Sequence, residues 1–114
     1  MKLEQAILKN LIYNEEYLRK VLPFLKSDYF SHGAERNLYH EITSFTETYN
    51  TTPTIEAISI AIREKRSFTD DEVQKCEDYL QEIKNNHQEK TEVQWLVDKT
   101  EKFCQEKAIY NAVL

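Results

Sequence analysis

The sequence contains a single glycine, Gly33, and two prolines among its 114 residues. Glycine-rich phosphate-binding loops and the Gly-x-Ser-x-Gly turn of serine hydrolases each need more than one glycine, so this chain has none of them. An architecture built from β-strands is also disfavoured, because it needs many tight turns made from these residues. The expected fold class is therefore all-α, with short connections between helices.

Metal-binding and redox motifs are lacking as well. Cys76 and Cys104 are far apart in the sequence and neither is close to a histidine, so we expect two packed, reduced thiols of an intracellular protein. His32 and His40 are eight positions apart, and His87 lies in a polar segment, so none of the three is expected to bind a metal. No catalytic residue, cofactor site or metal site is predicted, and the chain by itself is not expected to be an enzyme.

The sequence has no excess of positive charge and no long apolar run. Its formal net charge is −5, which argues against a surface that follows nucleic-acid phosphates. The N-terminus has no signal-peptide pattern, and no segment is apolar for long enough to cross a bilayer. We therefore expect a cytoplasmic protein without a membrane partner.

What the sequence does contain is a series of amphipathic patterns with helical spacing. Together they predict a compact bundle of about six helices, near residues 2–13, 14–22, 34–49, 55–65, 70–84 and 91–114. Asn14, Thr54 and Thr69 are placed as N-caps, and Thr69 with Glu72 has the spacing of a capping box.

Within the third of these helices, the spacing predicts a buried face made of Leu38, Ile42, Phe45 and Tyr49.

Two charged clusters have structural explanations. Asp70, Asp71 and Glu72 resemble an acidic metal site, but they stand at a predicted helix start, where acidic residues are favoured. The basic residues at positions 63, 65 and 66 stand at a helix end, where positive charge is favoured, so nucleic-acid contact is not needed to explain them.

The last helix has apolar residues on two sides. Its main face is predicted to enter the core, whereas a second group forms a candidate interface: Trp95, Ile109, Tyr110 and Val113. No stop signal precedes Leu114, so we interpret the chain as ending inside a helix that continues toward a helical hairpin. We thus expect a single helical domain over residues 1–114, with residues 92–114 leading into that hairpin.

The order of these features resembles the N-terminal domain of DnaB-type replicative DNA helicases, most closely the hexameric helicases of T-even-type bacteriophages. The resemblance is carried by five elements in order: Glu4 to Leu8, the Leu-Pro-Phe-Leu segment at 22–25, Asp28-Tyr29-Phe30, Leu38-Tyr39 with Ile42, and Pro53-Thr54-Ile55. Residues 95–112 resemble the helix that precedes the hairpin of that family. Thr51-Thr52 stands where cellular members usually have a glycine-containing turn, which fits a phage branch better.

The resemblance implies a collar domain that supports hexamer assembly and docks primase, and in some systems a helicase loader. It also implies a parent protein that unwinds DNA with ATP and Mg²⁺ in the host bacterial cytoplasm and contacts single-stranded DNA through a motor domain. That motor is absent from these 114 residues.

Four alternatives are considered on the sequence alone. The chain could be the helicase-binding helical domain of a primase, or a free-standing replication adaptor. A helix-turn-helix DNA-binding domain is disfavoured by Pro53 in the turn and by a poor set of base-reading residues, Glu56, Ser59 and Arg63. A small enzyme would need a pocket with strongly perturbed carboxylates.

Overall fold

The computed structural model describes residues 2–113, and its secondary structure is entirely helical over that range. Six α-helices follow one another: α1 (Leu3–Tyr13), α2 (Glu15–Val21), α3 (Ala34–Tyr49), α4 (Ile55–Glu64), α5 (Asp70–Asn85) and α6 (Val93–Val113). A single 3-10 turn, η1 (Ser27–Tyr29), lies between α2 and α3. The predicted fold class is confirmed; Leu114, where the sixth helix was expected to end, lies outside the described residues.

Local signals set the helix boundaries as the sequence predicts. The side-chain oxygens of Asn14 and Thr54 accept hydrogen bonds from backbone N–H groups in the first turns of α2 and α4. Thr69 and Glu72 form a complete capping box at the start of α5. Gly33 precedes α3 at φ 101°, and Asn50 ends it at φ 56°, a left-handed conformation that asparagine tolerates well. The boundaries of these helices are thus encoded locally.

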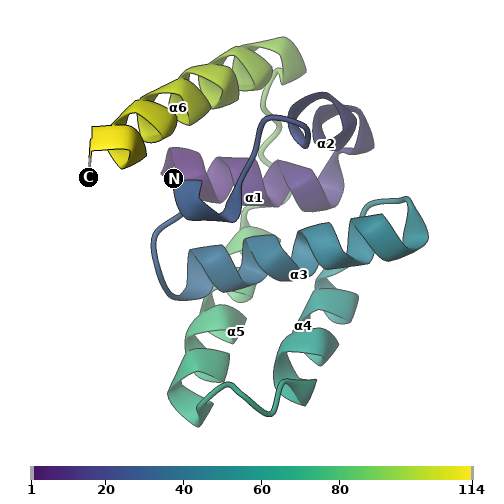
Figure 1. Ribbon diagram of the computed structural model, residues 1–114. Helices are drawn as coiled ribbons and strands as arrows, with labels where there is room; N and C mark the ends of the chain where they lie inside the picture. Colours follow the sequence, from purple (N-terminus) through teal and green to yellow (C-terminus); the bar gives the residue numbers. More distant parts are fainter. Residues whose placement is uncertain (1, 114) are drawn as a thin grey trace.

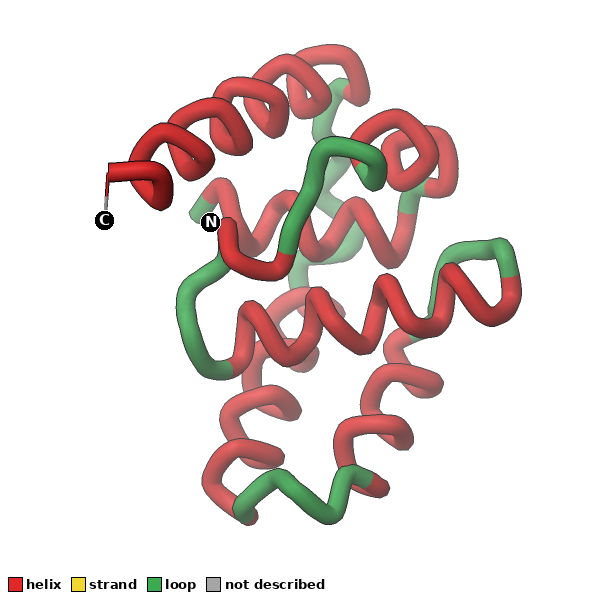
Figure 2. Tube along the Cα trace, in the orientation of Figure 1, coloured by secondary structure: helices red, strands yellow, loops and turns green. Residues whose placement is uncertain are grey.

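The helices stack around α1 and α3, which pack against each other in the middle of the molecule (Figure 1). On one side of α3, α4 and α5 form a pair that packs against it; on the far side of α1, α2 and α6 pack together. Figure 2 shows that the connections are short, apart from the segment that contains η1. As a result, α5 and α6 are consecutive in sequence but pack against different neighbours.

The central helix α1 is apolar around most of its circumference. Ile7, Leu8, Leu11 and Ile12 are all almost completely buried, which agrees with the broad apolar stripe of this segment. On another side of the core, Phe30 stacks against Tyr39 at 4.8 Å between ring centroids and lies 5.8 Å from the ring of Phe103. The buried apolar side chains form one cluster to which all six helices contribute.

The buried face of α3 differs from the predicted one at its C-terminal end. Leu38 and Ile42 are completely buried, as expected, but Phe45 is only half-buried and Tyr49 is 65% exposed. These two rings instead lie against each other, with centroids 4.7 Å apart. The helix period identifies the face correctly, but the last turns of α3 extend beyond the part of that face that the core covers.

Candidate functional site

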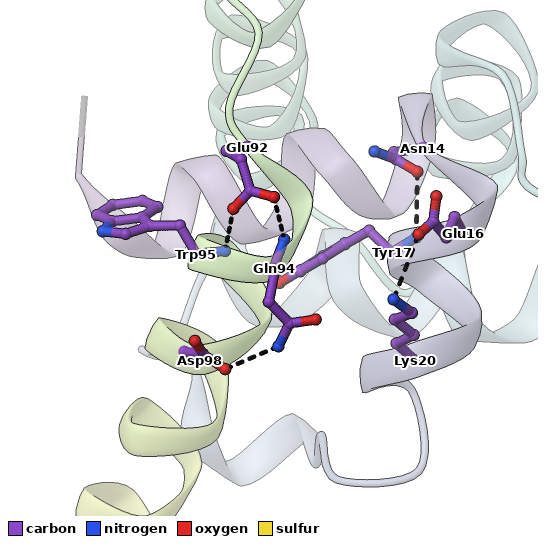
Figure 3. A network of polar contacts seen from close by, with 8 residues as sticks. All are labelled: Asn14, Glu16, Tyr17, Lys20, Glu92, Gln94, Trp95 and Asp98. Carbon is purple, nitrogen blue, oxygen red and sulfur yellow. Dashed lines mark hydrogen bonds and ion pairs between the residues drawn. The ribbon is translucent and has the colours of Figure 1, made fainter.

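The candidate interface lies on α6, and the N-terminus of this helix is capped by a carboxylate. The backbone N–H groups of Gln94 and Trp95 donate to the two carboxylate oxygens of Glu92, over 3.1 and 2.6 Å (Figure 3). This capping satisfies N–H groups that have no partner within the helix and places negative charge at its positive end. Figure 3 also shows the indole of Trp95 directed away from Tyr17.

The first half of α6 packs against the rest of the domain through one face. Its buried residues recur at helical spacing: Leu96, Val97, Thr100, Phe103 and Cys104. The hydroxyl groups of Thr100 and Tyr17 share a buried hydrogen bond of 2.6 Å, which joins α6 to α2. Burial raises the pKa of the Tyr17 phenol above its ordinary value of 10.0, so this group stays protonated into the alkaline range.

The second half of α6 has little cover from the rest of the described chain. Between positions 105 and 113, every residue is exposed except Lys107, which is half-buried. Lys107 holds its ammonium over the ring of Phe103, and Asn111 donates a long 3.4 Å hydrogen bond to the backbone oxygen of Asp28. In Figure 1 the end of α6 extends past the N-terminus of α1.

All four residues of the candidate interface are exposed: Trp95 by 52%, Ile109 by 68%, Tyr110 by 58% and Val113 by 78%. They do not form one continuous patch. Trp95 and Val113 are separated by about 27 Å along the helix at about 1.5 Å per residue. Ile109, Tyr110 and Val113, by contrast, occur within the last turns, and we call these three residues the α6 tip.

Charged residues separate Trp95 from the α6 tip. Lys99 lies one turn after Trp95 and holds its ammonium 5.7 Å from the indole centroid, so part of the ring is already covered. Lys102 and Glu106 follow on exposed positions. Apart from Trp95, the large exposed apolar side chains of α6 therefore gather at the α6 tip, where they can pack against another helix.

Metal binding and thiol reactivity were considered for the described residues. No three His, Cys, Asp or Glu residues between positions 2 and 113 are grouped so that they could hold a metal ion. Both cysteines are free and buried, and burial raises the pKa of each thiol to about 11. Such thiols are poor nucleophiles at neutral pH.

The predicted basic cluster is largely engaged by acidic partners. Lys65 forms a 2.8 Å ion pair with Glu41, and Arg63 lies 3.4 Å from Glu77. Ser59, which we expected on an exposed reading face, is instead buried and donates to Glu77 over 2.7 Å. Because α4 directs Ser59 toward α5, it does not present the side-chain set that a DNA-recognition helix needs.

Sequence reasoning missed Lys9, which is 3% exposed in the middle of α1. Lysine is usually a surface residue, so its identity gave no signal. The neighbouring residues did give a signal, because Lys9 stands within an apolar stripe that covers most of the helix.

Among the helices of residues 2–113, none is both long enough and apolar enough to span a membrane.

Comparison with known proteins gives two results. The family model for the DnaB-like helicase N-terminal domain matches residues 1–101. A DnaB-like replicative helicase of Enterobacteria phage T4 is 32% identical to this chain over 108 residues, which are 95% of this chain and 22% of the relative. The chain thus spans about a fifth of the length of that relative.

Proposed function

The chain belongs to the DnaB-like helicase N-terminal domain family, and we propose that it is the N-terminal collar domain of a phage replicative DNA helicase. The resemblance that the sequence suggested is therefore confirmed at the level of the family. In this proposal the domain supports assembly of a hexameric ring and offers a docking surface for primase or a helicase loader. A motor domain elsewhere in the parent protein would bind ATP and Mg²⁺, contact single-stranded DNA and unwind the duplex.

The observation that carries the proposal is the exposed α6 tip. Its three apolar side chains lie at the end of a helix whose other face is fixed to the body by Thr100 and Phe103. Exposed aromatic and aliphatic side chains that lie together on a helix are suited to the centre of an interface.

The first test is to read the parent gene beyond codon 114. The proposal expects a second hairpin helix and then a Gly-x-x-x-x-Gly-Lys-Ser/Thr loop, which binds nucleotide phosphates. A stop codon soon after position 114 would remove the motor and leave an adaptor.

The second test measures the oligomeric state of the parent protein. Ile109→Asp should shift the ring toward smaller species in sedimentation velocity, because it buries a charge in the proposed interface. Ser44→Asp is the matched control, since it adds the same charge at an exposed position on α3. Equal assembly of both variants would exclude the α6 tip from the ring contacts.

A further inference from the structure

Lys9 has a charged group that is removed from water and bonded only to backbone. Its ammonium donates to the carbonyl oxygen of Asn86 over 3.2 Å and to that of Glu89 over 2.6 Å. No carboxylate within residues 2–113 forms an ion pair with it. A buried charge without a compensating partner is costly, so something else must stabilise it.

The C-cap of α5 and the loop that follows it provide that compensation. Asn86 is the C-cap of α5, and Tyr13 is the last residue of α1. Lys9, Tyr13 and residues of the loop after α5, among them His87 and Glu89, line a cavity of about 330 Å³. Because a helix C-terminus carries partial negative charge, a cation at the C-cap of α5 is favoured. The Lys9 ammonium therefore belongs to this junction. It adds a second hydrogen bond to the Asn86 carbonyl oxygen, which also accepts from the Glu89 backbone N–H over 3.1 Å, and it donates to the carbonyl oxygen of Glu89.

The two carbonyl groups lie in the connection between α5 and α6. This loop, residues 86–92, joins helices that pack against different neighbours: α5 packs against α3 and α4, and α6 against α2 and η1. Glu89 precedes the first residue of α6 by only four positions. The place at which the loop is held on α1 therefore constrains the point at which α6 begins.

We propose that Lys9 is a latch that fastens the α5–α6 loop to α1 and so sets the position and direction of α6. Two charge-assisted hydrogen bonds to successive parts of the loop hold it at one place. The latch explains why a charged residue occupies the interior of α1. A correctly placed α6 would also present the α6 tip for assembly, and this consequence rests on the proposed function. The latch itself does not rest on the proposed function.

Gln5 provides a matched control one turn earlier on the same helix. It is also buried, and its amide donates to the Glu82 carboxylate over 2.8 Å. This bond joins α1 to the body of α5, not to the loop. Gln5→Met and Lys9→Met each remove one buried polar end and keep an unbranched apolar stem.

Hydrogen–deuterium exchange of the whole 114-residue chain tests the latch. Lys9→Met should raise amide exchange of residues 86–92 and of the first turns of α6 by about tenfold or more, as expected for lost hydrogen bonds to a charged group. The amides of α3 should keep their wild-type rates, and Gln5→Met should leave the loop unchanged. A uniform rise over all helices, or no rise at the loop, would overturn the proposal.

A measurement on the unchanged chain covers the case in which Lys9→Met does not fold. In ¹⁵N NMR of the lysine side chains, the ammonium of Lys9 should exchange with water at least about tenfold more slowly than that of an exposed lysine such as Lys26, because its protons are held by carbonyl groups. Equal exchange of all lysine ammonium groups would contradict the latch. Neither readout depends on oligomerisation, so failure of the latch and failure of the collar proposal are distinguishable.

Discussion

The phenolic oxygen of Tyr17 on α2 lies 2.6 Å from the hydroxyl oxygen of Thr100 on α6, across 83 residues of sequence. The Thr100 hydroxyl itself donates to the backbone oxygen of Leu96 over 2.7 Å, so Tyr17 is the donor of the shared bond. Both residues are completely buried. This pair is the main polar connection between α6 and the rest of the core.

Removal of either hydroxyl should destabilise the domain, but by different amounts. Tyr17→Phe should cost about 1 kcal/mol, because Thr100 keeps its bond to Leu96. Thr100→Val should cost more, about 1–3 kcal/mol, because it leaves the Tyr17 hydroxyl buried without an acceptor. Urea unfolding of both variants and the double variant checks this. Costs that simply add in the double variant would show that the two hydroxyl groups do not interact.

Substitutions on α3 should distinguish its covered turns from its uncovered end. Ile42→Ala should cost about 2–5 kcal/mol as a cavity-forming change in the core. Phe45→Ala should cost about 1 kcal/mol, chiefly the loss of its aromatic contact with Tyr49. Thermal unfolding of the two variants tests the order. A larger effect at position 45 would place that ring in the core.

The two buried thiols should react slowly with thiol reagents. They should also make the free energy of unfolding depend on pH in the alkaline range. Burial raises the pKa of Cys76 and of Cys104 from 9.0 to about 11 in the folded chain. Their contribution is fully present below pH 9.0 and is lost as the pH rises from 9.0 to about 11, because only the unfolded chain releases the protons readily.

A thiol reagent at pH 8 and urea unfolding against pH measure these two effects. In native buffer both cysteines should react slowly, and in urea at the rate of free thiols. The double Cys→Ala variant is the control, because it should lack the part of the pH dependence that the thiols cause. Rapid labelling of the folded chain would show that the thiols are accessible.

Truncation of exposed aromatics on α6 should separate folding from association. Trp95→Ala and Tyr110→Ala should each change the free energy of unfolding of this domain by about 0.5 kcal/mol or less, because both rings are largely exposed. Tyr110→Ala should weaken self-association or primase binding of the parent protein more than Trp95→Ala, since Lys99 already covers part of the indole. Normal assembly with a strongly lowered melting temperature would assign Tyr110 to the core.

Features encoded by neighbouring residues could be predicted from the sequence. The capping box of Thr69 and Glu72 spans one turn, and the stripe from Cys76 to Ile83 follows the helix period. Both depend only on contacts within a few residues. Their prediction therefore needed no knowledge of how the helices pack.

Features created by packing could not be predicted in this way. Phe45 has the spacing of a core residue, but its burial depends on where the neighbouring helices end. Lysine is usually a surface residue, yet Lys9 is buried because its ammonium donates to loop carbonyl oxygens 77 and 80 residues later in the chain. The exposure of Ile109 similarly reflects how far α6 extends beyond its supports.

The pairing of α1 with late segments has a consequence for biosynthesis. The polar groups of Gln5 and Lys9 find their partners at Glu82, Asn86 and Glu89, 77 to 80 positions further along the chain. The ribosome makes α1 before the other helices of this domain, so these groups stay without their partners until α5 and its following loop have left the exit tunnel. The first helix of the domain to be synthesised is thus among the last to be completed, and the domain acquires its native core only when nearly all of it has been translated.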